Sequence, residues 1–263
     1  MTTATDAGTI NALLNELRTA TKAIAGDEWL SQDLAGTPKA GLDQLGPNGK
    51  PLQALDNAGV GFLTPMISFL EEPLNQLKGN PDGVQNGAGE FEKAGKDATT
   101  LADNYRDKAK SETSGWSGES AADYAKTGKE LVDGVLSVAE TALTNATAMI
   151  KAGEVVAQVV AEVTRLITEA IGKIVPIMTQ AIAAAPATFG QSIAVAIPQC
   201  VQIAVDCGMQ IAAKLGELLA SGENLIKLVE GASAVLKVVK QAMSVIGEQA
   251  QTGSAKLPTA KAS

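Results

Sequence analysis

The side chains that most often carry out protein chemistry are scarce in this chain. It contains no histidine, which removes the commonest general base and the commonest protein metal ligand. Without histidine, a serine or cysteine catalytic triad of the common kind cannot form. The sequence also lacks a glycine-rich phosphate loop followed by lysine, a zinc-binding helix motif and a nucleophile elbow. We therefore predict a protein that is not an enzyme and that uses no metal and no cofactor.

The two cysteines, Cys200 and Cys207, are too few for a thiolate metal site or a disulfide framework. On one continuous helix, positions seven apart are separated by a rise of about 10.5 Å. A disulfide needs Cα atoms within about 7 Å of each other. The pair could therefore form a disulfide only if the helix broke between them, and the simpler interpretation is two small buried thiols. The adjacent Glu71 and Glu72 lie on a short polar segment flanked by proline and are interpreted as solvated surface.

Composition narrows the class of partner. Hydrophobic residues make up 45% of the chain and aromatic residues only 3%, so the apolar content is mainly Ala, Val, Leu and Ile, which pack helices closely. The net charge of -8 repels phosphate backbones, which makes nucleic acid an unsuitable partner. The first residues show neither the basic start nor the apolar stretch of a secretory signal peptide. Export from the cytoplasm would then need a route independent of such a peptide.

Apolar residues recur every three or four positions over most of the chain, which predicts an all-α fold. A first helix over 8–25 should end at Gly26. The stretch 31–60 is rich in proline and glycine and is predicted to be a loop or arm with little regular structure. Residues 62–77 should form a short interrupted helix, and a turn over 79–82 should lead into a new helix.

The strongest local feature is the turn Gly115-Trp116-Ser117-Gly118 between two long amphipathic helices. The helix before it shows apolar residues at helical spacing from Val84 to Ala109, and the helix after it begins near Glu119, where an acidic side chain suits the positive helix end. We expect the Trp116 indole to cap the end of the hairpin core. We expect Gly118 to adopt a backbone geometry that residues with a Cβ atom resist.

The helix after the turn carries a heptad pattern, which predicts intimate packing between helices. Adjacent positions such as Val132 and Leu136 are also apolar, so the apolar stripe is wide enough to favour a bundle over a two-stranded coiled coil. Asn145 lies in this pattern, either as a polar position beside water or as a contact that fixes the register. The two predicted columns are Val135, Ala142, Met149, Val156, Val163 and Ala170, and Leu131, Val138, Asn145, Ala152, Val159 and Leu166.

A last long helix carries a third seam from Ile211 to Ile246, which includes Leu215, Leu225 and Leu236 as candidate interaction residues. Before it, the stretch from Ile174 to Val205 has no charged residue. Its three prolines, Pro176, Pro186 and Pro198, should each kink or end a helix, so we expect short helical pieces that fold back on the bundle. This stretch is interpreted as buried core, with a permanent transmembrane helix or a conditional membrane-insertion element as alternatives.

The chain resembles the WXG superfamily of helical hairpins that actinobacterial type VII (ESX) secretion systems export, and more closely the larger EspA/EspE-like secretion-associated proteins. The resemblance covers about residues 60 to 175. It rests on the run from Phe91 to Ala94, on the stretch from Gly115 to Ala125 with its Trp116, Gly118 and Tyr124, and on the lead-in from Phe69 to Leu74. The family's export signal, Tyr-x-x-x-Asp/Glu, is absent, because Ala109 follows Tyr105 and Gly128 follows Tyr124 at that spacing.

The resemblance implies an elongated helical bundle built on a WXG-type hairpin with long C-terminal helices. It divides the chain into an N-terminal helix and arm (1–60), the hairpin (61–175), proline-broken apolar helices with a long C-terminal coiled-coil helix (176–250) and a disordered tail (251–263). It also implies a non-enzymatic protein, secreted or in the cell envelope, that binds a small WXG-type helical partner or itself. A co-exported partner would then carry the missing signal.

Two other functions remain open at this point. A membrane-active, pore-forming helical protein would use the apolar segment 174–205 for conditional membrane contact. The scaffold of a polymorphic toxin would carry a similar hairpin before a C-terminal effector, but the residues after the last predicted helix leave no room for one.

Overall fold

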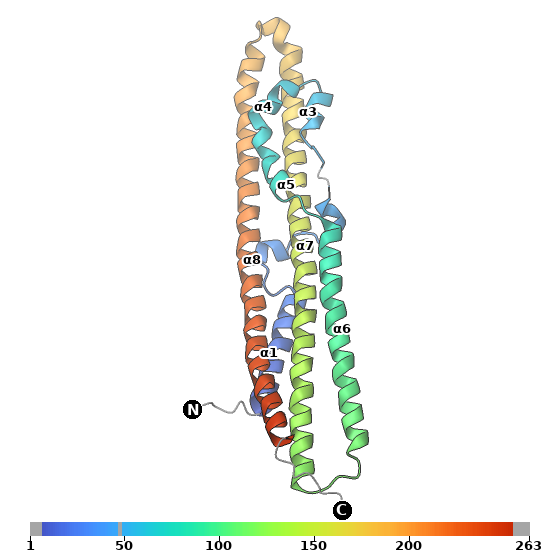
Figure 1. Ribbon diagram of the computed structural model, residues 1–263. Coiled ribbons are helices and arrows are strands. Elements are labelled where there is room, and N and C mark those ends of the chain that lie inside the picture. The colour runs from blue at the N-terminus through green and yellow to red at the C-terminus, as the bar shows by residue number, and fades with distance from the viewer. Residues whose placement is uncertain (1–6, 47–48, 255–263) are drawn as a thin grey trace, which may run out of the picture. The chain divides into compact units, whose positions relative to one another are not determined.

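The structure is a computed structural model that describes residues 7–46 and 49–254. Every regular element in these residues is a helix, which confirms the predicted all-α helical bundle (Figure 1). The chain forms two compact units. Unit 1 comprises Met1–Glu28, Asn86–Met149 and Leu225–Ser263, and unit 2 comprises Trp29–Gln85 and Ile150–Asn224. Each unit combines segments that are far apart in the sequence, because the two longest helices contribute one part of their length to each unit.

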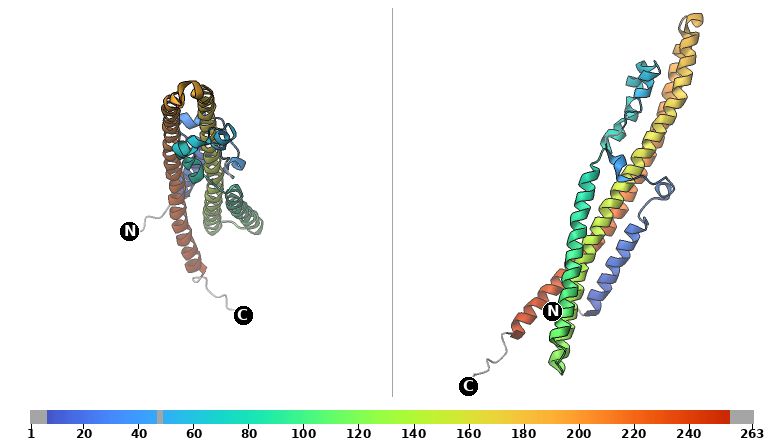
Figure 2. Two further views of the ribbon diagram at one scale, coloured as in Figure 1. Left: turned by 90° about the horizontal axis from the view of Figure 1, so that it is seen from above. Right: turned by 90° about the vertical axis from the view of Figure 1, so that its right-hand side faces the viewer.

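Four long helices supply most of the structure: α1 (Ala7–Ala25), α6 (Pro81–Glu112), α7 (Glu119–Thr188) and α8 (Gln191–Ser254). Helix α1 ends immediately before Gly26, as predicted. At the start of α6, the Asn80 side-chain oxygen accepts a hydrogen bond of 3.1 Å from the Gly83 N–H, so the predicted helix start after the 79–82 turn is also confirmed. Within unit 1, α6 and α7 lie side by side in every view (Figure 2).

The predicted loop over 31–60 is wrong in part, because this stretch contains helical turns. Each short helix here and in the following residues buries an apolar side chain, and this burial compensates for the prolines and glycines that shorten the helices. The short helices are α2 (Gln32–Ala35), η1 (Leu42–Leu45), α3 (Gln53–Asn57), η2 (Gly61–Leu63), α4 (Thr64–Ile67), η3 (Ser68–Leu70) and α5 (Glu72–Gln76).

The prediction that the prolines break the apolar stretch is wrong. Helix α7 continues through Pro176 and Pro186, and α8 continues through Pro198. All three prolines lie on exposed positions of their helices. Each proline ring and the carbonyl that it displaces therefore avoid the packed helix face. The chain reverses only once here, at Phe189 and Gly190.

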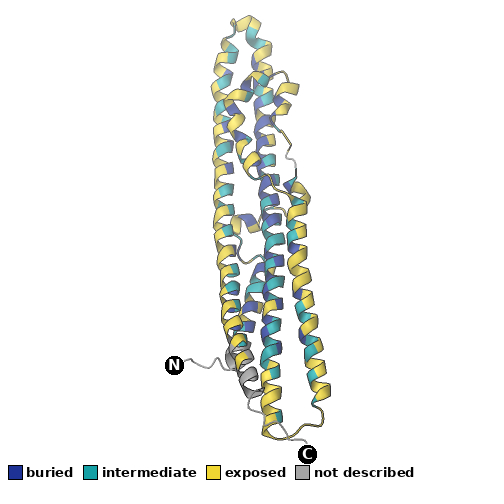
Figure 3. Ribbon diagram, viewed as in Figure 1, coloured by how far each residue is buried: buried dark blue, intermediate teal, exposed yellow. Residues whose placement is uncertain are grey.

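Both units contain buried positions along their helices (Figure 3), and the side chains at these positions differ between the units. In unit 2, large apolar residues are fully buried: Leu34, Leu52, Leu55, Leu63, Ile67, Leu70, Leu74, Ile167 and Ile174. In unit 1, Leu17 of α1 packs with Ala232, Val235 and Val239 of α8, while small side chains fill much of the remaining interior. Such small side chains allow helices to approach closely but bury less apolar area per residue.

The C-terminal end of the last helix also differs from the prediction. Helix α8 extends to Ser254, so residues 251–254 are helical and do not belong to the predicted disordered tail. The rest of that predicted tail, 255–263, lies outside the described residues. The side chain of Ile246, the last member of the predicted α8 seam, is also outside them.

Candidate interaction surface on the α6–α7 hairpin

The predicted turn joins α6 to α7 as a closed helical hairpin. Helix α6 ends at Glu112, and α7 begins at Glu119. The Trp116 N–H donates a hydrogen bond of 2.9 Å to the Thr113 carbonyl, and the Ala122 N–H donates one of 3.2 Å to the Gly118 carbonyl. Gly118 has a φ of 89°, in the left-handed region where a Cβ atom is unfavourable, so the predicted role of this glycine is confirmed.

The expected role of Trp116 as a cap on the hairpin core is wrong. Its side chain is 58% exposed, and its ring packs only against the Tyr124 ring among the aromatic residues that the structure describes, with centroids 5.3 Å apart and planes tilted by 53°. This tilted arrangement is favourable for aromatic pairs. Gly115 lies at an exposed position in the same turn, with open space where a Cβ atom would be. The turn therefore presents an aromatic pair at the surface.

Small residues bring α6 and α7 close together. Ala88, Gly95 and Ala102 are the buried residues of α6 and recur every seven positions. A Cβ atom on Gly95 would lie 2.8 Å from Leu143 Cγ and 3.0 Å from the Ala139 carbonyl oxygen, so no larger residue fits at this position without a shift of α7. The sequence predicts one series of apolar positions on α6. In the structure, these positions form a buried column and a second, exposed stripe.

That second stripe is the clearest unpaired apolar surface of the hairpin. Phe91, Ala94, Ala98, Leu101 and Tyr105 follow one another at steps of three and four residues along α6. Leu101 is 62% exposed and Phe91 is 41% exposed. Residues at this spacing lie on one face of a helix. An apolar helix face of this kind can pack against the apolar face of a second helix.

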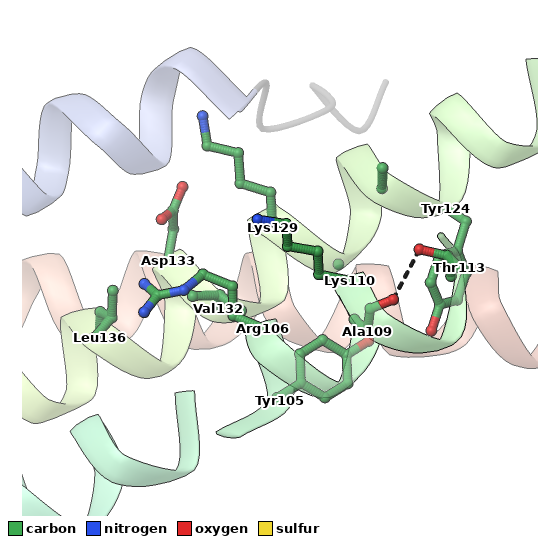
Figure 4. Close-up of a pocket in the computed structure, with 12 residues that line it drawn as sticks. Tyr105, Arg106, Ala109, Lys110, Thr113, Tyr124, Lys129, Val132, Asp133 and Leu136 are labelled. Carbon is green, nitrogen blue, oxygen red and sulfur yellow. Dashed lines mark hydrogen bonds between the residues drawn. The ribbon is translucent and has the colours of Figure 1, made fainter. Parts of the chain in front are cut away.

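A cavity of about 440 Å³ opens between α6 and α7 near the turn, at the end of this stripe. Its walls include Ala109 and Val132, and the phenols of Tyr105 and Tyr124 also line it (Figure 4). Three cationic side chains surround it: Arg106 and Lys110 from α6 and Lys129 from α7. Arg106 pairs with Asp103, whereas Lys110 and Lys129 form no ion pair with another residue in the described ranges.

The pKa of the Tyr105 phenol reflects the environment of this cavity. Burial is the largest cause that raises the pKa of Tyr105 above its ordinary value of 10.0, and the hydrogen bond and charge interaction that it shares with the neighbouring Tyr124 phenol raise this pKa further. Tyr105 therefore stays uncharged to higher pH than a free tyrosine. The cavity combines apolar walls and two phenols with the charges of Arg106, Lys110, Lys129 and Asp133, so its lining carries one carboxylate among three cations.

Of the residues that line this cavity, only Tyr124 is a candidate site residue predicted from the sequence. Arg106, Lys110 and Lys129 gave no signal, because isolated cations on a polar helix face look like ordinary solvated surface. Their positions at helical spacing on facing helices become informative only when the pairing of α6 with α7 is known.

The predicted heptad of α7 has the correct period. Its last predicted members, Val159, Val163, Leu166 and Ala170, are buried as expected, whereas in unit 1 the buried column is displaced by one position. The continuously buried column is Val132, Ala139, Ala146, Gly153, Val160, Ile167, Ile174 and Ala181. In the predicted column, Val138 is 40% exposed and Leu131 and Asn145 are half-buried. Within unit 1, α7 contacts α1, α6 and α8, so its buried stripe is broad and a two-partner heptad does not locate its centre.

The polar contact expected near Asn145 lies one residue earlier in the chain. Thr144 is fully buried, and its hydroxyl is 2.6 Å from the hydroxyl of Thr21 on α1. Thr21 also donates a hydrogen bond of 3.1 Å to Glu140. The Asn145 side chain makes no hydrogen bond within the part of the chain that the structure describes. The pair of threonines is therefore the polar contact that sets α1 against α7.

The predicted seam of α8 is correct in one of its two columns. In the first column, the buried residues are Ile211, Leu225, Ala232 and Val239, as predicted. Leu215 and Leu236 are only half-buried, since the second buried column contains Cys200, Cys207, Ser221 and Val235. Leu225 thus belongs to the internal packing of unit 1 and is not free for an external partner.

Both cysteines are free and buried on one continuous helix, which confirms the prediction of two separate thiols. Burial raises the pKa of Cys207, with Lys173 acting in the opposite direction. Among the described residues, no group of three or more His, Cys, Asp or Glu side chains is placed to hold a metal ion.

No model of a protein family, no curated protein and no solved structure matches this chain, so the fold is described here from its own residues.

Proposed function

We propose that this chain is a non-enzymatic protein associated with type VII (ESX) secretion, and that it binds a helical partner through the exposed stripe of α6. The partner is a small helical hairpin of the WXG type. The observation that carries this proposal is the stripe from Phe91 to Tyr105, which ends at the exposed Trp116–Tyr124 pair. An apolar helix face that stays exposed within its own unit is suited to helix-on-helix association.

The cavity beside the turn adds a chemical preference to this surface. Lys110 and Lys129 lie next to apolar walls and have no ion pair with other described residues. An acidic side chain of the partner at this level would meet two cations in a partly apolar environment, where such a contact guides orientation more than it adds affinity. The partner helix is therefore expected to carry apolar residues at steps of three and four with an acidic residue at the end near the turn.

The chain lacks the Tyr-x-x-x-Asp/Glu export signal of the family that it resembles. Under this proposal, the partner supplies that signal, and the complex leaves the cytoplasm for the cell envelope or the exterior by a route that needs no signal peptide. Binding and export are then linked, because a variant that cannot bind the partner has no signal of its own.

The first experiment measures complex formation with a small WXG-type helical hairpin protein, by size-exclusion chromatography with light scattering. Leu101→Asp places a charge in the centre of the stripe and should weaken the complex by at least about tenfold, since a charge cannot be buried without a partner. Ile226→Asp is the matched control, because Ile226 is also an exposed apolar residue of unit 1, 57% exposed, but lies on α8. This control should bind normally.

A complex that survives Leu101→Asp as well as Ile226→Asp would contradict the role of the stripe. If the wild-type protein forms a stable homodimer and only Leu101→Asp dissociates it, the stripe mediates self-association. The export half of the proposal is tested in culture filtrate. A chain found only in the cytosol of a strain with an active secretion system would contradict it.

A further inference from the structure

The second hairpin of the molecule, between α7 and α8 in unit 2, ends in a tip without charge. After Lys173, about 15 residues of α7 up to Thr188 carry no charged side chain, and about 15 residues of α8 follow before Asp206. Phe189 and Gly190 join the two arms. We propose that this tip, residues 174–205, is a lipid-binding element that enters one leaflet of a bilayer.

Much of the tip is exposed (Figure 3), and it carries apolar residues at exposed as well as buried positions. Ile174, Met178, Ala181, Ala196 and Cys200 are buried. Outside them, the exposed large apolar residues of the tip are Ile182, Phe189 and Val195, with Val205 at its base. Helices α7 and α8 each contain a stretch that is long and apolar enough to cross a membrane, which extends beyond the uncharged residues of the tip, and 39% and 22% of these stretches are buried. A core helix of a water-soluble protein with this composition would be largely buried.

Phe189 occupies the end of the tip, and the fold itself gives no reason for a large apolar residue there. Its side chain is 99% exposed, and its φ of 49° lies in the left-handed region, which disfavours residues other than glycine and asparagine. A strained and fully solvated phenylalanine makes no contribution to folding. The same side chain at the leading end of a membrane element would be the first to enter the lipid.

Hydroxyl and backbone groups of the tip form hydrogen bonds within the hairpin, which lowers the cost of leaving water, whereas the exposed amides of Gln180, Gln191 and Gln199 form none among the described residues. The Ser192 hydroxyl donates a hydrogen bond of 2.7 Å to the Ala181 carbonyl, and the Gly190 N–H donates one of 2.9 Å to the Ala185 carbonyl. The Thr188 hydroxyl donates a hydrogen bond of 3.0 Å to the Ala184 carbonyl. Helical hairpins suit lipid for this reason, since unpaired backbone groups are costly there.

The charged residues of both arms begin at the same level, which sets the depth of insertion. Glu169 and Lys173 of α7 line a common surface depression with Asp206 of α8. At 1.5 Å per residue, each arm above this level is about 22 Å long. This length exceeds half of a hydrocarbon core of about 30 Å but does not cross it. The tip therefore enters one leaflet and leaves the charges among the headgroups, without forming a pore.

The test is flotation of the full-length protein with phosphatidylcholine vesicles, because the net charge of -8 disfavours an anionic surface. The double variant Phe189→Asp with Val195→Asp should reduce the partition coefficient by at least about tenfold, since a carboxylate in the hydrocarbon is strongly unfavourable. Leu219→Asp is the matched control, because Leu219 is 70% exposed on α8 in the same unit but lies below the charged level. Far-UV circular dichroism verifies that all variants are folded.

Depth is measured with Phe189→Trp and lipids brominated on their acyl chains. The added fluorescence should be quenched beyond the background from Trp29 and Trp116, which the wild-type protein provides. Failure of the wild-type protein to float would overturn the proposal, as would equal loss of flotation in the Leu219→Asp control. Release of an encapsulated dye by the wild-type protein would show that the bilayer is breached, which contradicts insertion into one leaflet.

Discussion

The two hairpin turns of this molecule share a construction and differ in their surroundings. Each places one glycine at positive φ, Gly118 at 89° and Gly190 at 83°, and each exposes one aromatic side chain, Trp116 or Phe189. Trp116 packs against a tyrosine in a turn flanked by Glu112 and Glu119, whereas Phe189 ends two arms that carry no charge. A glycine at positive φ therefore occurs in both turns, but Trp116 lies among charged residues and Phe189 lies at the end of an uncharged hairpin.

The helices behind the two turns differ in a related way. The α6–α7 hairpin packs through Ala88, Gly95 and Ala102, and its remaining apolar residues form an exposed stripe on α6. The α7–α8 arms pack through larger residues such as Ile167 and Ile174, which are fully buried. Small contact residues allow close approach but contribute less burial energy per residue. The first hairpin is thus suited to gain a further helix, and the second is stable as a separate element that can carry an exposed apolar tip.

The largest expected effect tests this difference in packing. Ile174→Ala removes a fully buried side chain from the base of the uncharged hairpin and should destabilise the protein by about 2–5 kcal/mol. Val132→Ala, at the base of the charged hairpin, removes fewer atoms from a position that is 6% exposed and should cost less. Urea unfolding followed by circular dichroism measures both. Equal losses would contradict the difference in packing, because Val132→Ala would then cost more for each atom removed.

The two turn glycines provide the next test. Gly118→Ala and Gly190→Ala each place a Cβ atom at positive φ without any steric contact to a neighbouring residue, so each should cost about 1–2 kcal/mol from the backbone alone. Asparagine at either position should cost less, because it tolerates this region better. Thermal unfolding of the four variants gives the comparison. A loss of stability at only one of the two turns would show that the two glycines do not have equivalent backbone roles.

Phe189→Asn should produce a smaller change of the opposite sign. The substitution removes a side chain that is 99% exposed and relieves the left-handed backbone, so the protein in water should gain about 0.5–1 kcal/mol. Trp116→Ala should instead lose a few tenths to about 1 kcal/mol, because it breaks the contact with Tyr124. Urea midpoints distinguish the two signs. A loss of stability in Phe189→Asn would mean that Phe189 supports the fold.

The smallest effect is a change in titration at the charged hairpin. Tyr105 and Tyr124 are the only two tyrosines, so Tyr124→Phe leaves Tyr105 alone to be followed by absorbance at high pH. The midpoint should stay above 10.0 because burial, the largest cause, remains, but it should fall below the wild-type Tyr105 value as the contribution of Tyr124 is lost. A midpoint at or below 10.0 would show that the cavity is fully solvated.

The same shift predicts how stability depends on pH. The pKa of Tyr105 is raised in the folded state, so its contribution is fully present below the unfolded value near 10.0 and is lost as the pH rises through the folded value. From about pH 9 to about pH 12, roughly one unit below to two units above this value, stability should fall less steeply in Tyr105→Phe than in the wild-type protein. An identical slope in both proteins would contradict this coupling.

Several features followed from the sequence because they depend on neighbours along the chain. The end of α1 before Gly26, the start of α6 after Asn80, the turn at Gly118 and the separation of Cys200 from Cys207 all arise from local backbone preferences or helical rise. The period of the α7 heptad was also correct, since residues 3.6 per turn place every third or fourth side chain on one face.

Other features required the tertiary structure. The buried column of α7 passes through Ala139 and Ala146, one position from the predicted column, because three neighbouring helices in unit 1 determine which side of a broad apolar stripe is covered. The helices that continue through Pro176, Pro186 and Pro198 depend on these residues lying on the exposed side. The exposure of Trp116 and Phe189 was likewise invisible in sequence. Local spacing determines which residues share a helix face, but only the packing of helices distant in sequence decides which face remains open.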